Sequence, residues 1–363
     1  MSELLSHRRM CPVASRCGGC PRIELSRAQR GQRALDEVAA LAREHLGYLP
    51  ELSWNEQVSP PGYRNRIRLR ITEEGALGFF NPEKTSDCAV LEPALRDFLQ
   101  QLSKRLAKHG RLLAPFQHLE VRSPDLDGVP SIFFTQRPGE VSKRAAPPAL
   151  AALKESWPTA RVAALGITPD EELPEQRFAL TDQVYQLVPL GGFLQVNHVV
   201  NRSLISALLR KVDEAGIESV ADLYCGSGNF LLPLLAQGLR GCGVESNLRS
   251  VRSARRALLA QGLSGRVHLA DARQLVPALR QELLLPQAPQ LLLFDPPRAG
   301  LKASARHYAQ LGSPTIAYFS CNPASLLGDL AVMSSCGYRV QSLQLFDMFA
   351  YTSHVEVMAW LAH

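Results

Sequence analysis

Residues 221–229 read Ala221-Asp222-Leu223-Tyr224-Cys225-Gly226-Ser227-Gly228-Asn229, an apolar strand that runs into a glycine-rich turn. Two later apolar runs also end in polar loops. Residues 291–294 lead into Asp295-Pro296-Pro297-Arg298, and residues 315–319 lead into Ser320-Cys321-Asn322-Pro323. In an open α/β sheet, strand ends of this kind line one crevice, and ligands bind there. The three stretches therefore predict a Rossmann-like sheet with one ligand site built from three loops.

The order of the expected elements divides the chain near residue 190. Before it, the pattern predicts an amphipathic helix over 25–46 ended by Gly47, short strands at 67–71, 131–134 and 184–188, and a helix near 94–109. Pro138 and the stretch 145–148 indicate loops. After it, strands alternate with helices expected at 199–214 and 247–261, which is typical of a parallel sheet. We predict a mixed α+β region over 1–190 and a Rossmann-like domain over 191–363.

The composition indicates a folded, cytoplasmic protein. Apolar residues make up 46% of the 363 residues, and no apolar run is long enough for a transmembrane helix or a signal peptide. The net charge is +6, and arginine outnumbers lysine by 33 to 7, which suits either nucleic acid or a GC-rich genome. Alternate residues of Arg64-Asn65-Arg66-Ile67-Arg68-Leu69-Arg70 share one strand face. These four arginines predict a basic ridge for RNA or DNA phosphate.

The glycine-rich turn predicts a nucleotide-like cofactor, because backbone without Cβ atoms approaches a ligand closely. The next strand ends in Glu245, which is placed for ribose hydroxyls. The third glycine of a dinucleotide fingerprint is missing, since position 231 is Leu. Asp222 would meet a cationic methionine end and Asp271 the adenine, while Asp295 would meet both cofactor and substrate. These features favour S-adenosylmethionine over a dinucleotide.

Cys321 is a candidate nucleophile, because it follows a buried strand at this ligand site and a thiolate is strongly nucleophilic. The alternative is a small buried core cysteine.

Several segments in the correct order resemble the RNA 5-methyluridine methyltransferase family. They are residues 222–230, 294–298, 320–323, 346–349 and 354–357. Phe193-Leu194-Gln195-Val196-Asn197 is similar to the segment of that family that contacts the cofactor. The sequence departs from the family at Gly328, where Arg is frequent, and at Ala350-Tyr351, where Pro-His is common.

The resemblance implies how the reaction would proceed. The Cys321 thiolate would add to C6 of uracil, and Glu356 would act as the base that removes the C5 proton after methyl transfer. An exposed strand residue is the alternative for Glu356. The cofactor site would comprise Gln195, Asp222, Tyr224, Gly226, Gly228, Asn229, Glu245, Asp271 and Asp295.

Four cysteines form a metal-binding pattern, Cys11-x5-Cys17-x2-Cys20 with Cys88 later in the chain. Spacing alone fits either a structural zinc or a [4Fe–4S] cluster. The resemblance implies the cluster, which the ribosomal-RNA members carry on this spacing. It also implies the shorter ribosomal type, because no OB-like domain fits before Cys11. Cys225, Cys242 and Cys336 are expected in the core.

The sequence therefore predicts a monomeric enzyme that methylates a uridine of ribosomal RNA, expected to be 23S, without a membrane partner. A transfer-RNA uracil-C5 methyltransferase is the nearest alternative. An iron–sulfur dinucleotide oxidoreductase would not explain Cys321 and Glu356. A catalytically silent RNA-binding protein would be expected to have lost one of that pair.

Overall fold

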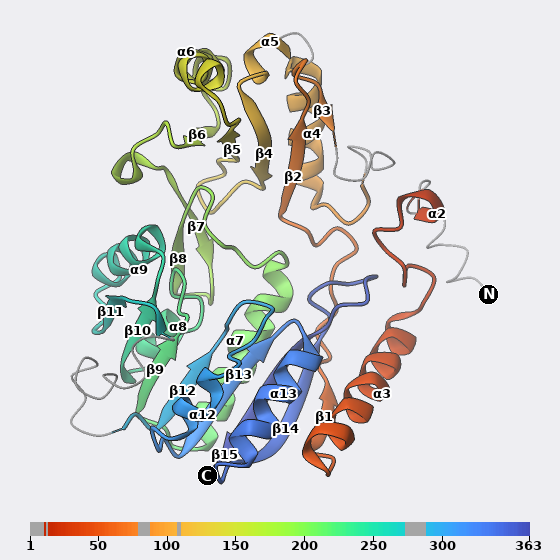
Figure 1. Cartoon of the computed structure of the whole chain (residues 1–363), viewed down its shortest axis with the longest axis vertical. Helices are drawn as coiled ribbons and strands as arrows, with labels where there is room; N and C mark the ends of the chain where they lie inside the picture. Colours follow the sequence, from red (N-terminus) through yellow and green to blue (C-terminus); the bar gives the residue numbers. More distant parts are fainter. Residues whose placement is uncertain (1–10, 12–13, 79–87, 107–109, 273–287) are drawn as a thin grey trace. The chain divides into compact units, whose positions relative to one another are not determined.

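The computed structural model describes residues 11, 14–78, 88–106, 110–272 and 288–363 (Figure 1). They fold into two compact units. Unit 1 consists of Met1–Glu24, Pro60–Phe178 and Leu187–His198, and unit 2 consists of Leu25–Ser59, Ala179–Gln186 and Val199–His363. The assignment of 1–190 and 191–363 to two functional domains stays a prediction.

Unit 2 is built on an eight-stranded sheet with the order β1-β14-β15-β13-β12-β9-β10-β11. β15 is antiparallel to both of its neighbours, and the other pairs are parallel. This arrangement confirms the predicted Rossmann-like class. The strands are β1 (Glu51–Trp54), β9 (Ser219–Leu223), β10 (Arg240–Glu245), β11 (Arg266–Leu269), β12 (Leu291–Phe294), β13 (Thr315–Ser320), β14 (Arg339–Phe346) and β15 (Glu356–Ala362).

The helices of unit 2 begin and end where local chemistry fixes them. Ser26 and Gln29 form a capping box at the start of α3, and Gly47 ends that helix with a left-handed φ of 75°. Asn247 caps α9 through its side chain, and Pro323 opens α13. The predicted ranges agree closely with α3 (Arg27–Leu46), α7 (His198–Glu214) and α9 (Leu248–Ala260); the others are α8 (Leu231–Ala236), α12 (Ser304–Ala309) and α13 (Pro323–Ser334).

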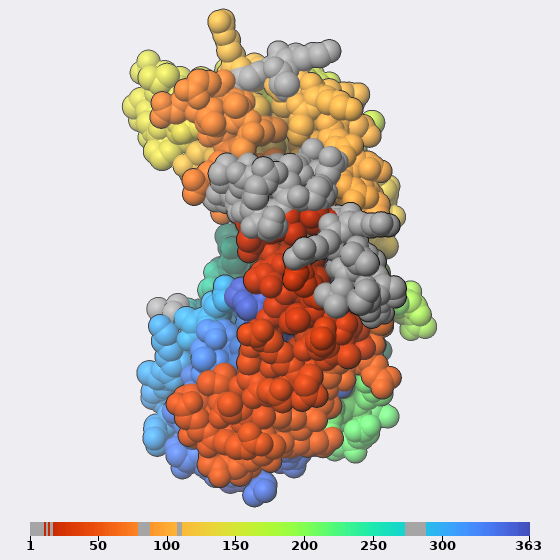
Figure 2. Space-filling view, turned by 90° about the vertical axis from the view of Figure 1, so that its right-hand side faces the viewer, coloured from red at the N-terminus to blue at the C-terminus, as the bar shows by residue number. Residues whose placement is uncertain are grey.

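The segment 25–59 completes the sheet of unit 2 although it precedes the other strands by more than 150 residues. β1 pairs in parallel with β14, and α3 packs beside α13. Ala34, Val38 and Ala42 of α3 enter the same apolar core as α12, α13 and the central strands. Figure 2 shows this red-to-orange segment on the surface beside blue C-terminal residues. β1 has only four residues, one exposed and three half-buried, and they carry little strand signal, which explains why the sequence did not predict it.

Unit 1 contains a second sheet with the order β3-β2-β4-β5-β6, in which only the β5–β6 pair is parallel. Its strands are β2 (Arg66–Ile71), β3 (Leu77–Gly78), β4 (Phe116–Arg122), β5 (Ser131–Gln136) and β6 (Arg161–Leu165). Its helices are α2 (Ala14–Cys17), α4 (Pro93–Leu106), α5 (Gly110–Leu113), α6 (Glu140–Ser156) and the short η1 (Asp170–Glu172). In a separate hairpin of β7 (Glu175–Ala179) and β8 (Tyr185–Pro189), the chain passes into unit 2 after Phe178 and returns to unit 1 after Gln186.

The expected loop at 145–148 is wrong, because these residues lie inside α6 with Pro147 and Pro148 in the helix. Each proline removes a backbone donor. The helix has a buried apolar face whose packing within unit 1 offsets that loss. This face consists of Ala146, Ala149, Leu150 and Leu153. The expected loop at Pro138 is correct.

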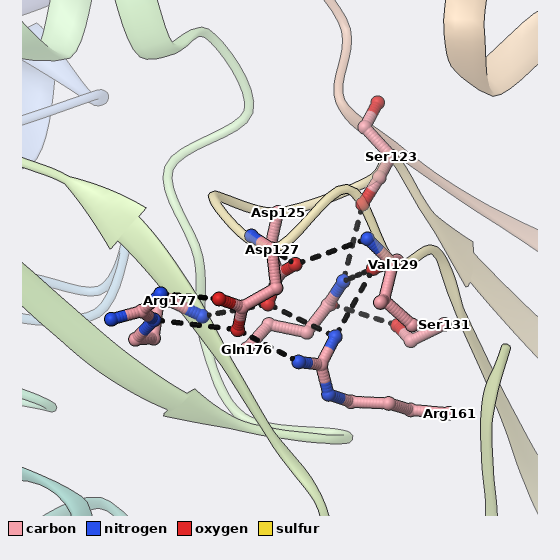
Figure 3. A network of polar contacts seen from close by, with 8 residues as sticks. All are labelled: Ser123, Asp125, Asp127, Val129, Ser131, Arg161, Gln176 and Arg177. Carbon is pink, nitrogen blue, oxygen red and sulfur yellow. Dashed lines mark hydrogen bonds and ion pairs between the residues drawn. The ribbon is translucent and has the colours of Figure 1, made fainter.

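A polar network fixes the start of β7 in unit 1 (Figure 3). Asp125 accepts hydrogen bonds from the backbone N–H groups of Asp127, Val129 and Arg177. Arg161 of β6 bridges Asp125 and Asp127 at 3.0 Å each. The buried Gln176 side chain bonds Ser131 and two backbone carbonyls. The loop after β4, the sheet and β7 are thus fixed together.

Within the described parts of the chain, no helix combines the length and the apolar character that a membrane span requires.

Candidate functional site

The three polar loops predicted to form one site do lie at one edge of the sheet. β13, β12 and β9 are consecutive, parallel neighbours. Their carboxyl ends therefore point the same way, and the loops at Cys321, Asp295 and Tyr224 follow them directly.

The antiparallel strand β15 brings Glu356 to the same edge. Ser320, the last residue of β13, pairs with Val357. Continuing this register by one residue places Cys321 opposite Glu356. On its other side Glu356 pairs with Phe346 of β14. Glu356 is only 4% exposed, so the alternative of an exposed strand residue is excluded.

Burial raises the pKa of the titratable groups at this edge, and neighbouring negative charge raises that of Glu356 and Cys321 further. Burial raises the pKa of Asp295 to about 7. Burial raises the pKa of Glu356 well above its ordinary value, and the charge of Asp295 adds to the effect. Burial, followed by the charge of Glu356, raises the pKa of the Cys321 thiol to about 11. Because these groups influence one another, they form one electrostatic cluster of a thiol and two carboxyls.

Arg298 connects the loops that carry the cluster. Its backbone carbonyl accepts hydrogen bonds from Asn322 Nδ2 at 3.1 Å and from Ser325 Oγ at 3.0 Å. Its Nη2 donates to Nδ1 of His354 at 3.3 Å, two residues before Glu356. The positive charge of Arg298 opposes the increase in the pKa of Cys321.

A buried acid precedes the glycine-rich loop. Asp222, in β9 just before the loop, is 1% exposed. Among the described residues neither of its carboxylate oxygens makes a well-formed hydrogen bond, although the backbone N–H of Leu231 acts to lower its pKa. Burial is the main reason why the pKa of Asp222 lies well above its ordinary value, and the charges of Asp295 and Glu245 raise it further. A buried acid without a well-formed hydrogen bond suits a cationic ligand.

The backbone of this loop is shaped for close approach. Gly226 and Gly228 have φ values of 55° and 91°, and Tyr224 has a φ of 88°, which is rare for a bulky residue. A Cβ atom at Gly228 would lie 2.7 Å from Cγ of Leu232. Strain of this kind gathers at ligand sites.

The other predicted cofactor residues are placed as follows. Glu245 ends β10 and accepts hydrogen bonds from Gly226 N at 3.1 Å and Asn247 N at 2.7 Å. The side chain of Asn229 forms a reciprocal pair with Asn201, at 2.8 and 3.1 Å. Asp271 is half-buried beyond β11. Gln195 belongs to unit 1, where its backbone carbonyl accepts a hydrogen bond from Asn65 Nδ2 at 2.7 Å.

Asp329 shapes the loop after Asp295, although the sequence did not single it out. It accepts hydrogen bonds from Leu301 N at 2.6 Å, Lys302 N at 2.9 Å and the Tyr318 hydroxyl at 2.7 Å. An aspartate on an otherwise apolar helix such as α13 is a signal for such a role.

The four cysteines of the predicted metal site all belong to unit 1. Cys17 and Cys88 are buried, and Cys11 and Cys20 are half-buried. Four thiols suit iron–sulfur chemistry. Among the residues described here, however, no three Cys, His, Asp or Glu side chains are arranged to hold a metal ion, so the expected convergence is not confirmed. Cys225 and Cys242 are core residues as expected, while Cys336 is half-buried.

Three members of the predicted arginine ridge lie on β2, whereas Arg64 precedes the strand and donates from Nε to the backbone carbonyl of Arg66 at 3.1 Å. The three on β2 differ from one another. Arg68 and Arg70 are exposed. Arg66 instead lies 3.9 Å from Glu120 and places its guanidinium 5.3 Å from the centroid of the Phe193 ring. Burial lowers the pKa of Arg66 to about 10. The acidic partner on β4 makes the ridge less uniformly basic than the sequence predicted.

The comparisons with known proteins agree with this geometry. The family model described as tRNA (Uracil-5-)-methyltransferase matches residues 161–363. The chain belongs to this family. It is 32% identical to the 23S rRNA (uracil(1939)-C(5))-methyltransferase RlmD of Pseudomonas aeruginosa strain UCBPP-PA14, over 99% of this chain and 81% of that protein. The corresponding protein of Edwardsiella ictaluri is 30% identical, with coverages of 99% and 84%.

Among solved structures, the fold is similar to that of the Pyrococcus abyssi tRNA (uracil-54, C5)-methyltransferase in complex with S-adenosyl-L-homocysteine. The TM-score is 0.69 at 22% identity, over 95% of this chain and 86% of that chain. Family membership confirms the resemblance found in the sequence. The chain is an S-adenosylmethionine-dependent RNA uracil-C5 methyltransferase.

The position of Arg298 predicts the titration of Cys321. With a pKa raised to about 11, the thiolate population increases with pH throughout the neutral range. Arg298→Met removes an opposing positive charge and should raise that pKa further. Iodoacetamide alkylation of Cys321, followed by peptide mass spectrometry across pH, should then be roughly tenfold slower at neutral pH for each unit of pKa gained.

Arg306→Met, which removes an exposed charge on α12, is the matched control and should leave the alkylation profile unchanged. A wild-type midpoint at or below the ordinary thiol value would contradict the electrostatic interpretation, as would an Arg298→Met profile identical to the wild type.

Proposed function

We propose that this chain methylates C5 of a uridine in 23S ribosomal RNA, with Cys321 as nucleophile and Glu356 as base. The observation that supports it most directly is the pair of Ser320 with Val357, because continuing this register by one residue sets Cys321 opposite Glu356, whose charge raises the pKa of the Cys321 thiol. Asp295 lies close enough to change the pKa of both.

The chemistry explains why both groups are needed. C5 of uracil is a poor nucleophile until a thiolate bonds to C6 and converts the ring into an enolate. When bound, S-adenosylmethionine would supply an electrophilic methyl group, which C5 would accept as the bond from that methyl to the sulfonium sulfur breaks and S-adenosylhomocysteine is left. Glu356 takes the C5 proton, the electrons of that C–H bond restore the C5–C6 double bond, and the Cys321 thiolate leaves. The raised pKa of the carboxyl suits a group that must hold this proton.

The cofactor would be held by the strand-end loops of unit 2. Asp222 is proposed for the cationic methionine end, Glu245 for the ribose, Asp271 for the adenine, and the backbone of Tyr224, Gly226, Gly228 and Asn229 for close contacts. Asp295 is proposed to contact both cofactor and substrate, and Gln195 of unit 1 to contact the cofactor.

Ribosomal RNA is proposed as substrate because the relatives with ~30% identity over nearly the whole chain are named for it. The tRNA enzyme of similar fold is less similar in sequence. Mass spectrometry of both RNA classes from a deletion strain tests the assignment. Loss of one 5-methyluridine from 23S ribosomal RNA would support it, and loss from transfer RNA alone would contradict it.

The catalytic pair should fail in two different ways when mutated. Cys321→Ala should bind RNA but form neither adduct nor product, because nothing adds to C6. Glu356→Gln should add to C6 and accept the methyl group, then stall because the C5 proton stays. The stalled RNA–protein adduct should survive denaturing electrophoresis and carry methyl label.

Cys336→Ala serves as the control thiol and should behave like the wild type. Turnover by Cys321→Ala would refute covalent catalysis. Normal turnover by Glu356→Gln would mean that another residue removes the C5 proton, and Asp295 would be the first candidate.

The two exposed arginines of the ridge should contact RNA phosphate. Replacing Arg68 and Arg70 with Gln should weaken RNA binding and flatten its dependence on salt by about 0.7 per lost phosphate contact on a single strand. Arg144→Gln with Lys154→Gln removes two exposed charges from α6 in the same unit and should leave the slope unchanged. An unaltered slope in the ridge variant would remove the ridge from the RNA site.

We also propose that Cys11, Cys17, Cys20 and Cys88 bind a [4Fe–4S] cluster. Metal binding and the ordering of a ligand loop are coupled, so the cluster would draw the four sulfurs together. Anaerobically purified protein should contain about four iron and four sulfide per chain, as a Cys₄-held centre requires. Cys88→Ser should lose iron and Cys336→Ser should retain it. Stoichiometric zinc without iron would contradict the proposal.

A further inference from the structure

One buried arginine holds the loop that leads into Glu356. Arg30, in the first turn of α3, is only 6% exposed. Its Nη2 donates to Oδ2 of Asp347 at 2.8 Å, and its Nη1 donates to the backbone carbonyl of Leu25 at 3.0 Å. Its Cζ lies 4.6 Å from the centroid of the Tyr351 ring. The guanidinium therefore joins the start of α3 to two points of the loop 347–355.

This loop needs such support. Asp347 is buried, and a buried carboxylate is stable only with a well-oriented partner. Tyr351 has a φ of 69°, a conformation that a bulky residue keeps only when its surroundings hold it. The planar guanidinium meets both demands, because it forms an ion pair with Asp347 and stacks on Tyr351.

The loop determines the position of Glu356. Its two ends are joined by the pair of Phe346 with Glu356, the last step of the β14–β15 ladder. Asp347 follows Phe346 directly. A shift of Asp347 would therefore act on the ladder at the position where Glu356 is paired.

The same helix also supports the nucleophile side. α3 packs along α13, and α13 begins at Pro323, two residues after Cys321. Through α3, one rigid element contacts the structures that carry both members of the catalytic pair.

We propose that Arg30 is a positioning residue, which holds the loop 347–355 so that the Glu356 carboxylate faces the C5 proton. The proposal rests on the proposed role of Glu356 as base. It assigns to α3 a part in the removal of the C5 proton, although α3 lies far from Glu356 in the sequence.

The test is a step-specific failure. Arg30→Met removes the ion pair and the charge over Tyr351 while keeping an unbranched apolar side chain. If Arg30 positions Glu356, methyl transfer should proceed, but proton removal should slow by roughly tenfold to 100-fold, since a small misplacement of a catalytic group has effects of this size. A methyl-labelled RNA–protein adduct should accumulate in single-turnover reactions with wild-type Glu356. RNA binding should be unchanged.

Three variants make the result specific. Arg33→Met, on the exposed side of the same helix, should show no adduct above wild type. Arg30→Lys should partly restore turnover, because it keeps a charge for Asp347. Tyr351→Leu keeps the ion pair and should accumulate a smaller amount of adduct, and it serves as the test if Arg30→Met does not fold.

The outcomes separate this proposal from the assignment of the base. Adduct with Glu356→Gln but none with Arg30→Met or Tyr351→Leu would overturn the role of Arg30 alone. A decrease in adduct formation and turnover by the same factor would also overturn it, because that indicates general loss of structure. No adduct with Glu356→Gln would refute Glu356 as base, and the proposal for Arg30 would fail with it.

Discussion

The site depends on the insertion of one antiparallel strand into an otherwise parallel sheet. β15 lies between β13 and β14, and its first residue is Glu356. A parallel strand at this position would begin at the opposite edge of the sheet and would present its first residue there. Because β15 runs the other way, its start meets the end of β13, where Cys321 follows. The ladder with β14 pairs Glu356 with Phe346, and the ladder with β13 fixes the next residue, Val357. A catalytic geometry is most accurate when rigid elements carry it.

That arrangement concentrates negative charge. Asp222, Asp295 and Glu356 are carried by adjacent or nearby strands. Burial raises the pKa of all three, and the charge of Asp295 raises the pKa of Asp222 and Glu356 further. A stable core avoids such a cluster, and neither carboxylate oxygen of Asp222 makes a well-formed hydrogen bond. The site is therefore arranged for a ligand that brings positive charge, and a cationic methyl donor has this property. Arg298 places a positive charge between the Cys321 loop and His354.

The sequence predicted the parts of the structure that local chemistry controls. Alternation of strands and helices predicted the sheet, and Gly47 predicted the end of α3. The caps at Ser26 and Asn247 were found only in the structure. Strand register and long-range contacts could not be predicted from the sequence. β1 forms because it pairs with the edge of β14, and its own four residues give no sign of this pairing. The prolines of α6 were misinterpreted because tertiary packing outweighed their local preference. Arg66 carries the same sequence signal as Arg68, yet Glu120 and Phe193 engage it.

The long-range contacts also show why a methyltransferase sheet includes a segment from the beginning of the chain. α3 and β1 cover the side of the sheet next to β14 and α13, which carry or adjoin the loops of the catalytic pair. Apolar packing alone would hold such a helix through Ala34, Val38 and Ala42. A buried arginine is not needed for that apolar packing, and its burial costs desolvation free energy. The presence of Arg30 at the end of α3 nearest the loop is therefore better explained by the orientation of that loop than by the stability of the fold. The geometry of Asp347 and Tyr351 around Arg30 identifies the loop before Glu356 as the element being oriented.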